Sequence, residues 1–461
     1  MRKYLLTLAA GLMAASLAIP ASAADFKYTG WFRVRGITAD DLDRNKNTHD
    51  GQQYYDSQIR PRFTATSEGG KIVSVYELDY QDGGNYVWGN DQGRPMVGIN
   101  RWWVDFLIPG TTLRMKYGKD DWTDPTKEIF DSVGANRQHG IGLYGKLFGP
   151  VDLSAFTVKY VDNTTGATAG ASRVGASDGD EYYVALKWQA APQIAITPWA
   201  ALDRRNTENA AGTTGYAVYM FALHGQAKVG ILDLAVQGIF ETGDAAQPTR
   251  TRRNLGDRDV DVEAWALMVR SWLTFEKLKI GFYFTWLTGD DDGVTATGNQ
   301  AQQPDRTLNR FMFPRGGASG WIEGPNILTG RRWSTITTGN ASGTNTTSVS
   351  QGIGAGQNTR PNGLIMPEIL VRYQLTPAVE LEGAVSFVRS AQKAPDVGAI
   401  SYDNAKNFGT VVEAGFRWKI YKELYLNMVG SYLAAGDYGV TQGGKANDDA
   451  WAIYYDLNYV W

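Results

Sequence analysis

Apolar and polar residues alternate along several segments of the chain. In the segment 277–287, apolar residues occupy the even positions from Leu278 to Trp286, whereas Lys279 and Thr285 lie between them. The same period of two recurs in two further segments, 423–433 and 450–461. Successive side chains of a β-strand point to opposite sides. The pattern therefore predicts strands with one apolar face, suited to lipid, and one polar face, suited to water.

Turn residues divide the chain at regular intervals. We expect short turns at 67–70, 109–111, 149–150, 190–192, 229–230, 276–277, 375–378 and 421–422. We expect longer polar connections at 37–53, 82–96, 119–138, 162–180, 206–215, 242–258, 288–362, 390–406 and 436–448. Short and long connections alternate throughout, so about eighteen strands are predicted (16–18), with the short turns on one rim and the long loops on the other.

This arrangement is typical of an all-β transmembrane protein: an antiparallel up-and-down β-barrel with short periplasmic turns and long extracellular loops. Closure satisfies every backbone donor and acceptor inside a bilayer, which an open sheet cannot do. A soluble β-sandwich also contains alternating strands, but it gives no reason for every long loop to lie on one side.

The N-terminus has the pattern of an export signal. A short basic start precedes an apolar run, and the sequence ASAA at 21–24 supplies the small residues of a cleavage site. We expect a signal peptide at 1–23, cleaved after Ala23, and a barrel at 24–461 in the outer membrane of a Gram-negative bacterium. The alternative, a retained membrane anchor, is disfavoured because the apolar run is short.

The C-terminus is aromatic. Trp461 ends the last alternating strand, and this resembles the C-terminal signature of outer-membrane proteins, which a barrel-assembly machinery inserts into the membrane. The expected partners are that machinery, outer-membrane lipid and lipopolysaccharide.

Composition excludes several other classes. The 461 residues include no Cys, which removes disulfides, covalent haem attachment and Cys-based zinc sites. The formal net charge of -3 gives no reason to expect nucleic-acid binding. The three histidines, His49, His139 and His224, show no pairing with a serine at an obvious spacing, so we expect no enzyme and no cofactor.

The aspartate run 290–292 is also not expected to hold a metal. Counted from Asp290, the fifth and sixth positions are Val294 and Thr295, where a calcium loop needs an acid and a glycine. We expect these carboxylates to stand in water where a strand leaves the membrane. A divalent ion that bridges them to lipopolysaccharide is the alternative.

A barrel of about eighteen strands is too wide for its own side chains to fill, so a water-filled lumen is expected unless loops plug it. The polar parity of the strands predicts a charged pore lining: Arg33, Arg35, Arg60, Arg62, Glu77, Asp79, Arg101, Asp105, Arg114, Lys116, Glu263, Glu380, Glu382, Glu413 and Arg417. Bases concentrate in the early strands and acids in the later ones. Two interpretations remain open: opposed walls that create a field across the lumen, or charges that merely pair with one another.

The connection after the fifth predicted strand is a candidate constriction. Asp124 followed by proline fits a helix N-cap, and PTKEIFDSV at 125–133 predicts a short helix. The acids of this segment are expected to face basic wall residues: Asp120, Asp121, Asp124 and Glu128. The alternative is a helix-bearing loop that caps the barrel without narrowing it.

One stretch resembles a known family. FYFTWLTGDDDG at 282–293, followed by FMFPRGG at 311–317 in the long loop 288–362, is similar to the alginate-export family of outer-membrane porins. The resemblance implies an 18-strand barrel lined by Arg and Lys for anionic solutes. General trimeric porins are an equally good template, and they imply a homotrimer.

The sequence thus predicts a porin: a passive diffusion channel for small hydrophilic solutes, with a leaning toward anions. Two alternatives remain, a substrate-specific channel for anionic saccharides and the barrel sheath of a larger outer-membrane complex. A receptor with an N-terminal plug is disfavoured, because the first strand begins almost at the mature N-terminus.

Overall fold

A computed structural model describes most of the chain. The described residues are 24–40, 51–82, 95–123, 138–162, 177–209, 212–245, 260–289, 307–309, 311, 363–392, 400–401, 406–436, 441–442 and 449–461. Several predictions from the sequence lie outside them: the signal peptide 1–23, Asp124 with the short helix at 125–133, the aspartate run 290–292 and most of the long loop 288–362.

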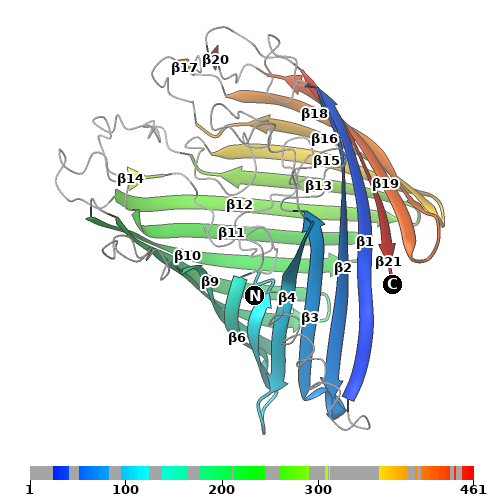
Figure 1. Cartoon of the computed structure of the whole chain (residues 1–461). Coiled ribbons are helices and arrows are strands. Elements are labelled where there is room, and N and C mark those ends of the chain that lie inside the picture. Colours follow the sequence, from blue (N-terminus) through cyan, green and yellow to red (C-terminus); the bar gives the residue numbers. More distant parts are fainter. Residues whose placement is uncertain are drawn as a thin grey trace.

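Eighteen long strands form the wall of a closed antiparallel barrel, as the sequence predicted (Figure 1). They are β1 (Ala24–Asp40), β2 (Gln52–Ser67), β3 (Ile72–Asp82), β4 (Pro95–Leu107), β5 (Leu113–Asp120), β6 (Gln138–Phe148), β7 (Val151–Asp162), β8 (Ser177–Ala191), β9 (Ile194–Asn209), β10 (Gly212–Val229), β11 (Leu232–Ala245), β12 (Val260–Phe275), β13 (Leu278–Leu287), β15 (Leu364–Thr376), β16 (Val379–Arg389), β18 (Asn407–Lys419), β19 (Leu424–Ala435) and β21 (Ala450–Val460).

Three short strands lie outside this wall. β14 (Thr307–Leu308) runs parallel to β12, while β17 (Ile400–Ser401) and β20 (Thr441–Gln442) pair with each other. A 3-10 turn at Glu68–Gly70 joins β2 to β3. Within the described residues, no helix is long and apolar enough to cross a membrane.

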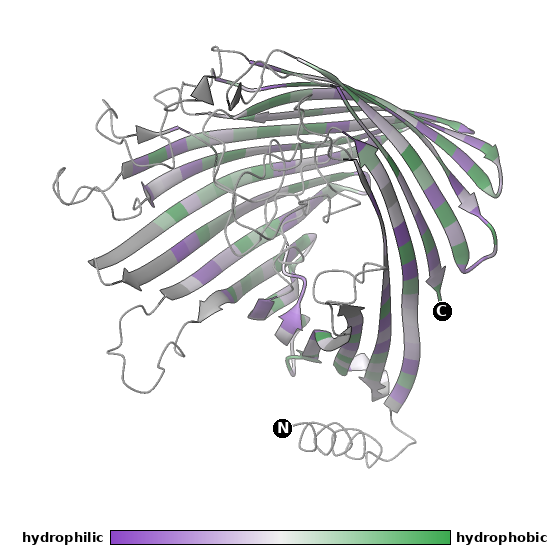
Figure 2. Ribbon diagram, turned by 45° about the horizontal axis from the view of Figure 1, so that its top comes forward, coloured by the Kyte–Doolittle hydropathy of each residue, from purple (hydrophilic) through white to green (hydrophobic). Residues whose placement is uncertain are grey.

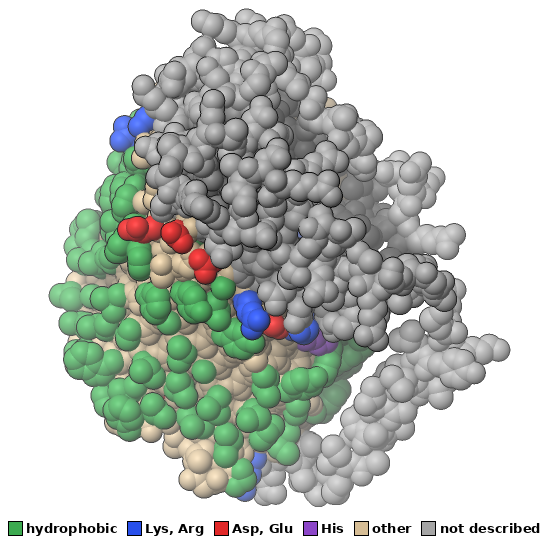
Figure 3. Space-filling view, turned by 90° about the vertical axis from the view of Figure 1, so that its left-hand side faces the viewer, with side chains coloured by type: hydrophobic (Ala, Val, Ile, Leu, Met, Phe, Trp, Pro, Cys, Tyr) green, Lys and Arg blue, Asp and Glu red, His purple; other side chains and the backbone are tan. Residues whose placement is uncertain are grey.

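The two faces of the wall differ as the alternation requires. On β10, Phe221 and Leu223 are 51% and 57% exposed, whereas Met220 and His224, on the opposite parity, are 1% and 2% exposed. Figure 2 shows hydrophilic and hydrophobic residues alternating along the strands, and Figure 3 shows a broad hydrophobic outer surface. The exposed apolar parity therefore faces outward, where lipid would cover it, and the other parity faces the lumen.

The barrel closes where β1 pairs with β21, from Trp31 opposite Val460 to Asp40 opposite Trp451. Gly30 and Trp461 extend the seam by exchanging two backbone hydrogen bonds of 3.0 and 3.1 Å. The Trp461 ring lies over Gly30, and a Cβ added there would come within 2.5 Å of the ring. Closure leaves no open sheet edge in the wall.

One predicted long connection is wrong. The segment 206–215 was expected to be a loop because it is polar, but β9 continues to Asn209 and β10 begins at Gly212, directly opposite. Backbone pairing continues past the apolar band because a strand in water needs no apolar face. For the same reason, β1 and β2 extend into the predicted connection 37–53.

Candidate functional site

The inward parity of β1 to β5 carries a dense group of charged side chains. We call this group the charged wall; its members are Arg33, Arg35, Arg60, Arg62, Glu77, Asp79, Arg101, Asp105, Arg114, Lys116 and Asp120, together with Asp121, which directly follows β5. Alternation places them there, because each strand contributes every second residue to the lumen. The antiparallel register then brings bases of one strand beside acids of the next.

The first part of the charged wall is centred on Asp79. Its carboxylate accepts a 2.8 Å hydrogen bond from the Gln58 side chain. It also forms an ion pair with Arg60 at 2.8 Å. Arg33 in turn donates to the Gln58 amide oxygen at 2.9 Å. The Arg33 and Arg60 guanidiniums lie 5.1 and 5.0 Å from the centroid of the Trp31 ring, in range for cation–π attraction. These contacts hold two arginines in fixed positions on the wall.

The second part is centred on Glu77, whose side chain is only 2% exposed. Arg62 forms an ion pair with it at 2.5 Å and Arg101 at 3.3 Å, and the Asn100 amide donates a further hydrogen bond. A carboxylate with this many charged and polar partners is fully compensated despite its burial.

Arg101 links this part to the end of β5. Its guanidinium contacts Asp120 at 3.2 Å and Asp121 at 2.6 Å. Lys116 also pairs with Asp120, and its ammonium lies 4.6 Å from the centroid of the Trp103 ring. Separately, Arg114 pairs with Asp105. Asp120 and Asp121, two of the predicted constriction acids, therefore lie against basic wall residues. Asp124 and Glu128 fall outside the described residues.

Bases and acids of the charged wall differ in exposure. The Arg62, Arg101 and Lys116 side chains are 38%, 21% and 17% exposed. The carboxylates of Glu77 and Asp105 are 2% and 3% exposed. In these pairs the cation stands closer to the water of the lumen than its acid; Arg35, which is 3% exposed, and the pair of Arg101 with Asp121, at 21% and 22%, are exceptions. The contacts favour the interpretation in which the luminal charges pair with one another. Within these pairs, however, the basic side chain is more exposed to water than the acidic one.

A second group of arginines lies near the short-turn ends of the later strands. Each guanidinium lies over an aromatic ring on the inward parity: Arg270 over Tyr283 at 5.1 Å, Arg372 over Trp272 at 4.9 Å, and Arg417 over Tyr425 at 4.5 Å. Trp272 donates a 2.9 Å hydrogen bond to the Tyr283 hydroxyl, which fixes both rings. Aromatic backing leaves the N–H edges of a guanidinium available to other partners.

Three of the four acids predicted for the luminal face of the later strands lie on that face, and the fourth does not. Glu382 faces Arg372 across the ladder and Glu380 faces Arg417, while Glu413 accepts a hydrogen bond from Ser431. Glu263 was assigned to the wrong face. It is exposed and shares the outward parity of Trp265, because the buried positions of β12 are Val262 and its alternate neighbours. The inward side of this part of β12 is apolar, so its charged residue lies on the outward side. Charge alone is therefore not sufficient to assign a residue to the lumen.

Part of the inner wall is apolar and buried, which the sequence reasoning missed. Trp122, Phe156, Tyr183 and Trp199 form a continuous run of ring contacts, with centroids 5.5, 4.6 and 5.6 Å apart. All four are at most 8% exposed. Their spacing along the chain gave no signal, because each ring comes from a different strand or loop.

Buried carboxylates share this region. Glu181, Asp203 and Glu241 project from the inward parity of β8, β9 and β11 and are at most 3% exposed. These are acids of the inner wall that the sequence reasoning did not assign. Among the described residues, no group of three or more His, Asp or Glu is arranged to hold a metal ion.

No protein-family model matches the sequence, and no curated protein matches it by sequence similarity. Its fold, however, is shared with solved structures of Pseudomonas aeruginosa proteins. OccK5 (OpdH), OccK8 (OprE) and the outer membrane protein OprD each align with a TM-score of 0.52, at 9%, 12% and 10% identity. The alignments cover 95% of this chain and 98%, 98% and 94% of theirs. This likeness establishes the fold of a bacterial outer-membrane β-barrel of the porin type; the narrower resemblance to the alginate-export porins stays a prediction.

Proposed function

We propose that this barrel is a passive diffusion channel for small hydrophilic solutes, with a preference for anions. The observation that carries the preference is the unequal exposure within the charged wall, where the Arg62 side chain is 38% exposed and its partner Glu77 only 2%. A solute in the lumen meets the cation first, and the carboxylate behind it weakens the positive field without reversing it.

The proposed pore lining combines the charged wall with the aromatic-backed arginines and their facing acids. Its members outside the charged wall are Arg270, Arg372, Arg417, Glu380, Glu382 and Glu413. Asp120 and Asp121 belong to the proposed constriction, together with Asp124 and Glu128. Because Arg101 contacts both Asp120 and Asp121, it is the residue through which the constriction would be fixed to the wall.

The proposed location is the outer membrane, with the long loops outside and the signal peptide removed after Ala23. Trp461 is proposed to have two roles: it is the aromatic terminus that the assembly machinery would read, and it completes the closing seam. A homotrimer is the proposed assembly, by analogy with general porins.

Conduction in planar lipid bilayers tests the proposal directly. Purified protein should produce discrete current steps, and a KCl gradient should give a reversal potential displaced toward that of chloride. Absence of steps from folded protein would contradict the channel and favour the sheath of a larger complex. Cation selectivity would contradict only the anion preference. Vesicle swelling with neutral sugars and with uronic acids of similar size would separate a general channel from one for anionic saccharides.

A further inference from the structure

A row of charged residues crosses the outer surface at the long-loop rim. The register places five side chains side by side on neighbouring strands: Lys119 on β5, His139 on β6, Lys159 on β7, Asp180 on β8 and Arg204 on β9. All five share the outward parity of their strands, and we call them the cationic row. Figure 3 shows charged and His side chains in a narrow band at the edge of the hydrophobic surface.

Several contacts fix the side chains of the cationic row. Lys159 forms an ion pair with Asp180 at 3.3 Å, and the Lys119 ammonium donates to the Ile99 carbonyl oxygen at 2.9 Å. The His139 ring lies 5.5 Å from that of Trp102. His139, Lys159 and Arg204 are exposed. Three permanent cations and one carboxylate leave this part of the rim with an excess of positive charge.

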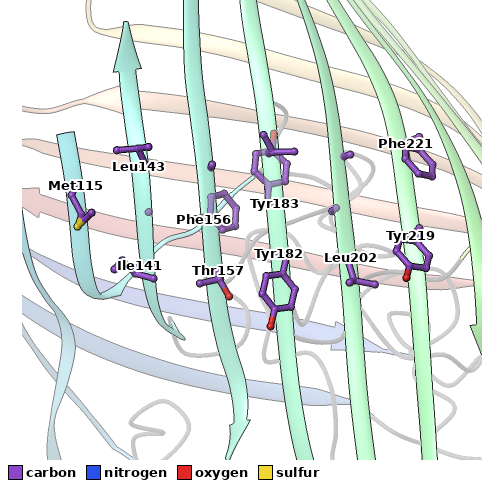
Figure 4. Close-up of a pocket in the computed structure, with 15 residues that line it drawn as sticks. Met115, Ile141, Leu143, Phe156, Thr157, Tyr182, Tyr183, Leu202, Tyr219 and Phe221 are labelled. Atoms are coloured by element: carbon purple, nitrogen blue, oxygen red, sulfur yellow. The ribbon is translucent and has the colours of Figure 1, made fainter. Parts of the chain in front are cut away.

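An apolar hollow lies directly below the cationic row. Two rungs of the ladder form it, one running from Ile141 through Tyr182 to Tyr219 and the next from Leu143 through Val184 to Phe221. It is a shallow hollow, open to the outside, with a volume of about 490 Å³ (Figure 4). The depth arises because small residues stand between large ones: Ala155 and Ala200 lie among the aromatic rings.

The charge of the rim changes sign on the next strands. Asp244 of β11 faces Asp261 of β12 across the ladder, and Glu263 lies one outward position further along β12. All three are on the outward parity, so this neighbouring part of the rim is acidic. Positive charge above an apolar hollow is therefore a property of β5 to β9, rather than of every strand that leaves the membrane.

We propose that the cationic row and the hollow together bind a phosphorylated, multiply acylated membrane lipid of the lipopolysaccharide class. Lys159 and Arg204 contact the phosphate through charge-assisted hydrogen bonds, and one acyl chain fills the hollow. The Tyr182 and Tyr219 rings belong to the rung of the hollow that is next to the cationic row, at the level where amphipathic rings meet head groups. The site rests on the proposed outer-membrane location with the long loops outside, but not on conduction.

Native mass spectrometry of the refolded full-length barrel, titrated with purified bisphosphorylated lipid A, tests this site. Removing two cations in K159Q/R204Q should weaken lipid binding about thirty-fold, because each Lys or Arg beside an anionic lipid surface strengthens binding about fivefold. The control K277Q/K422Q removes two exposed lysines at the short turns and should bind as the wild type does. A separate variant, A200W, fills the hollow and should weaken binding with both cations in place.

Dephosphorylated lipid A separates head-group from acyl recognition. It should bind weakly to the wild type, and K159Q/R204Q should make little further difference. Equal affinity of K159Q/R204Q and wild type for the phosphorylated lipid would overturn the proposal, as would an equal loss in K277Q/K422Q. If A200W dissociates barrel oligomers without changing lipid binding, the hollow is a subunit interface and the proposal is wrong. Bilayer conductance of the same variants should be unchanged, so failure of this site is distinguishable from failure of the channel.

Discussion

Replacing Arg62 with glutamine is expected to lower the preference of the barrel for anions. Arg62 is the most exposed member of the ion pairs in the charged wall, and its partner Glu77 keeps Arg101 and Asn100 after the substitution. The change therefore removes one unit of positive charge from the lumen while the buried carboxylate stays compensated.

The size of the effect follows from Coulomb's law. An ion that passes about 8 Å from the guanidinium through water interacts with it by about 0.5 kcal/mol. That energy changes the local concentration of an anion about 2.4-fold and of a cation by about the same factor in the opposite sense. The anion-to-cation permeability ratio should then fall about fivefold to sixfold, which displaces the reversal potential in a tenfold KCl gradient by roughly 30 mV.

Single-channel recordings at a mean salt concentration near 0.1 M, and again near 1 M, provide the assay. The displacement should shrink at high salt, because the Debye length falls from about 10 Å to about 3 Å. Arg389→Gln is the matched control, since Arg389 lies on the exposed outward parity of β16. A displacement below about 5 mV at low salt, or an equal one in the control, would refute the placement of Arg62 beside the ion path.

Three further perturbations test other parts of the structure. Glu77→Gln keeps the shape of the side chain but removes the charge that two arginines share, so the unfolding free energy measured by urea titration in lipid vesicles should fall by about 3 kcal/mol; a loss below about 1 kcal/mol would mean that water already screens these pairs. Phe156→Ala opens a cavity in the run of aromatic rings and should cost about 3–5 kcal/mol by the same titration, whereas a negligible cost would mean that the ring is not packed. Gly30→Ala places a methyl group against the Trp461 ring and should slow the appearance of the compact, heat-modifiable form in electrophoresis. Gly98→Ala, whose added Cβ meets nothing closer than 3.9 Å, is its control, and equal rates for both variants would contradict the role of the seam.

Turn chemistry and alternation were sufficient to predict the barrel. All eight expected short turns separate consecutive strands; six of them contain Gly or Pro, and the other two, 276–277 and 421–422, contain a lysine that interrupts the apolar alternation. The assumption that polar segments are loops failed at 206–215, where polar residues form strands. The residues around Asn206 are polar and still belong to a strand, since outside the bilayer backbone pairing alone maintains the ladder.

The lumen was less predictable than the wall. Parity placed Arg62 and Glu77 on the same face, but which acid each base would meet depends on the register between strands far apart in sequence. Glu77, for example, lies opposite Arg101 of β4 on one side and opposite Arg62 of β2 on the other, so its two basic partners follow from the stagger of three strands. The buried run from Trp122 to Trp199 likewise has no period along the chain.

The sequence by itself determined the alternating faces, the approximate strand number and the segregation of short and long connections. These are local properties, set by the period of a strand and by turn residues. Only the tertiary structure decided the pairing of charges in the lumen, the outward position of Glu263, and the cationic row above an apolar hollow. Each of those depends on the stagger between neighbouring strands, which backbone hydrogen bonds and closure of the whole barrel fix together.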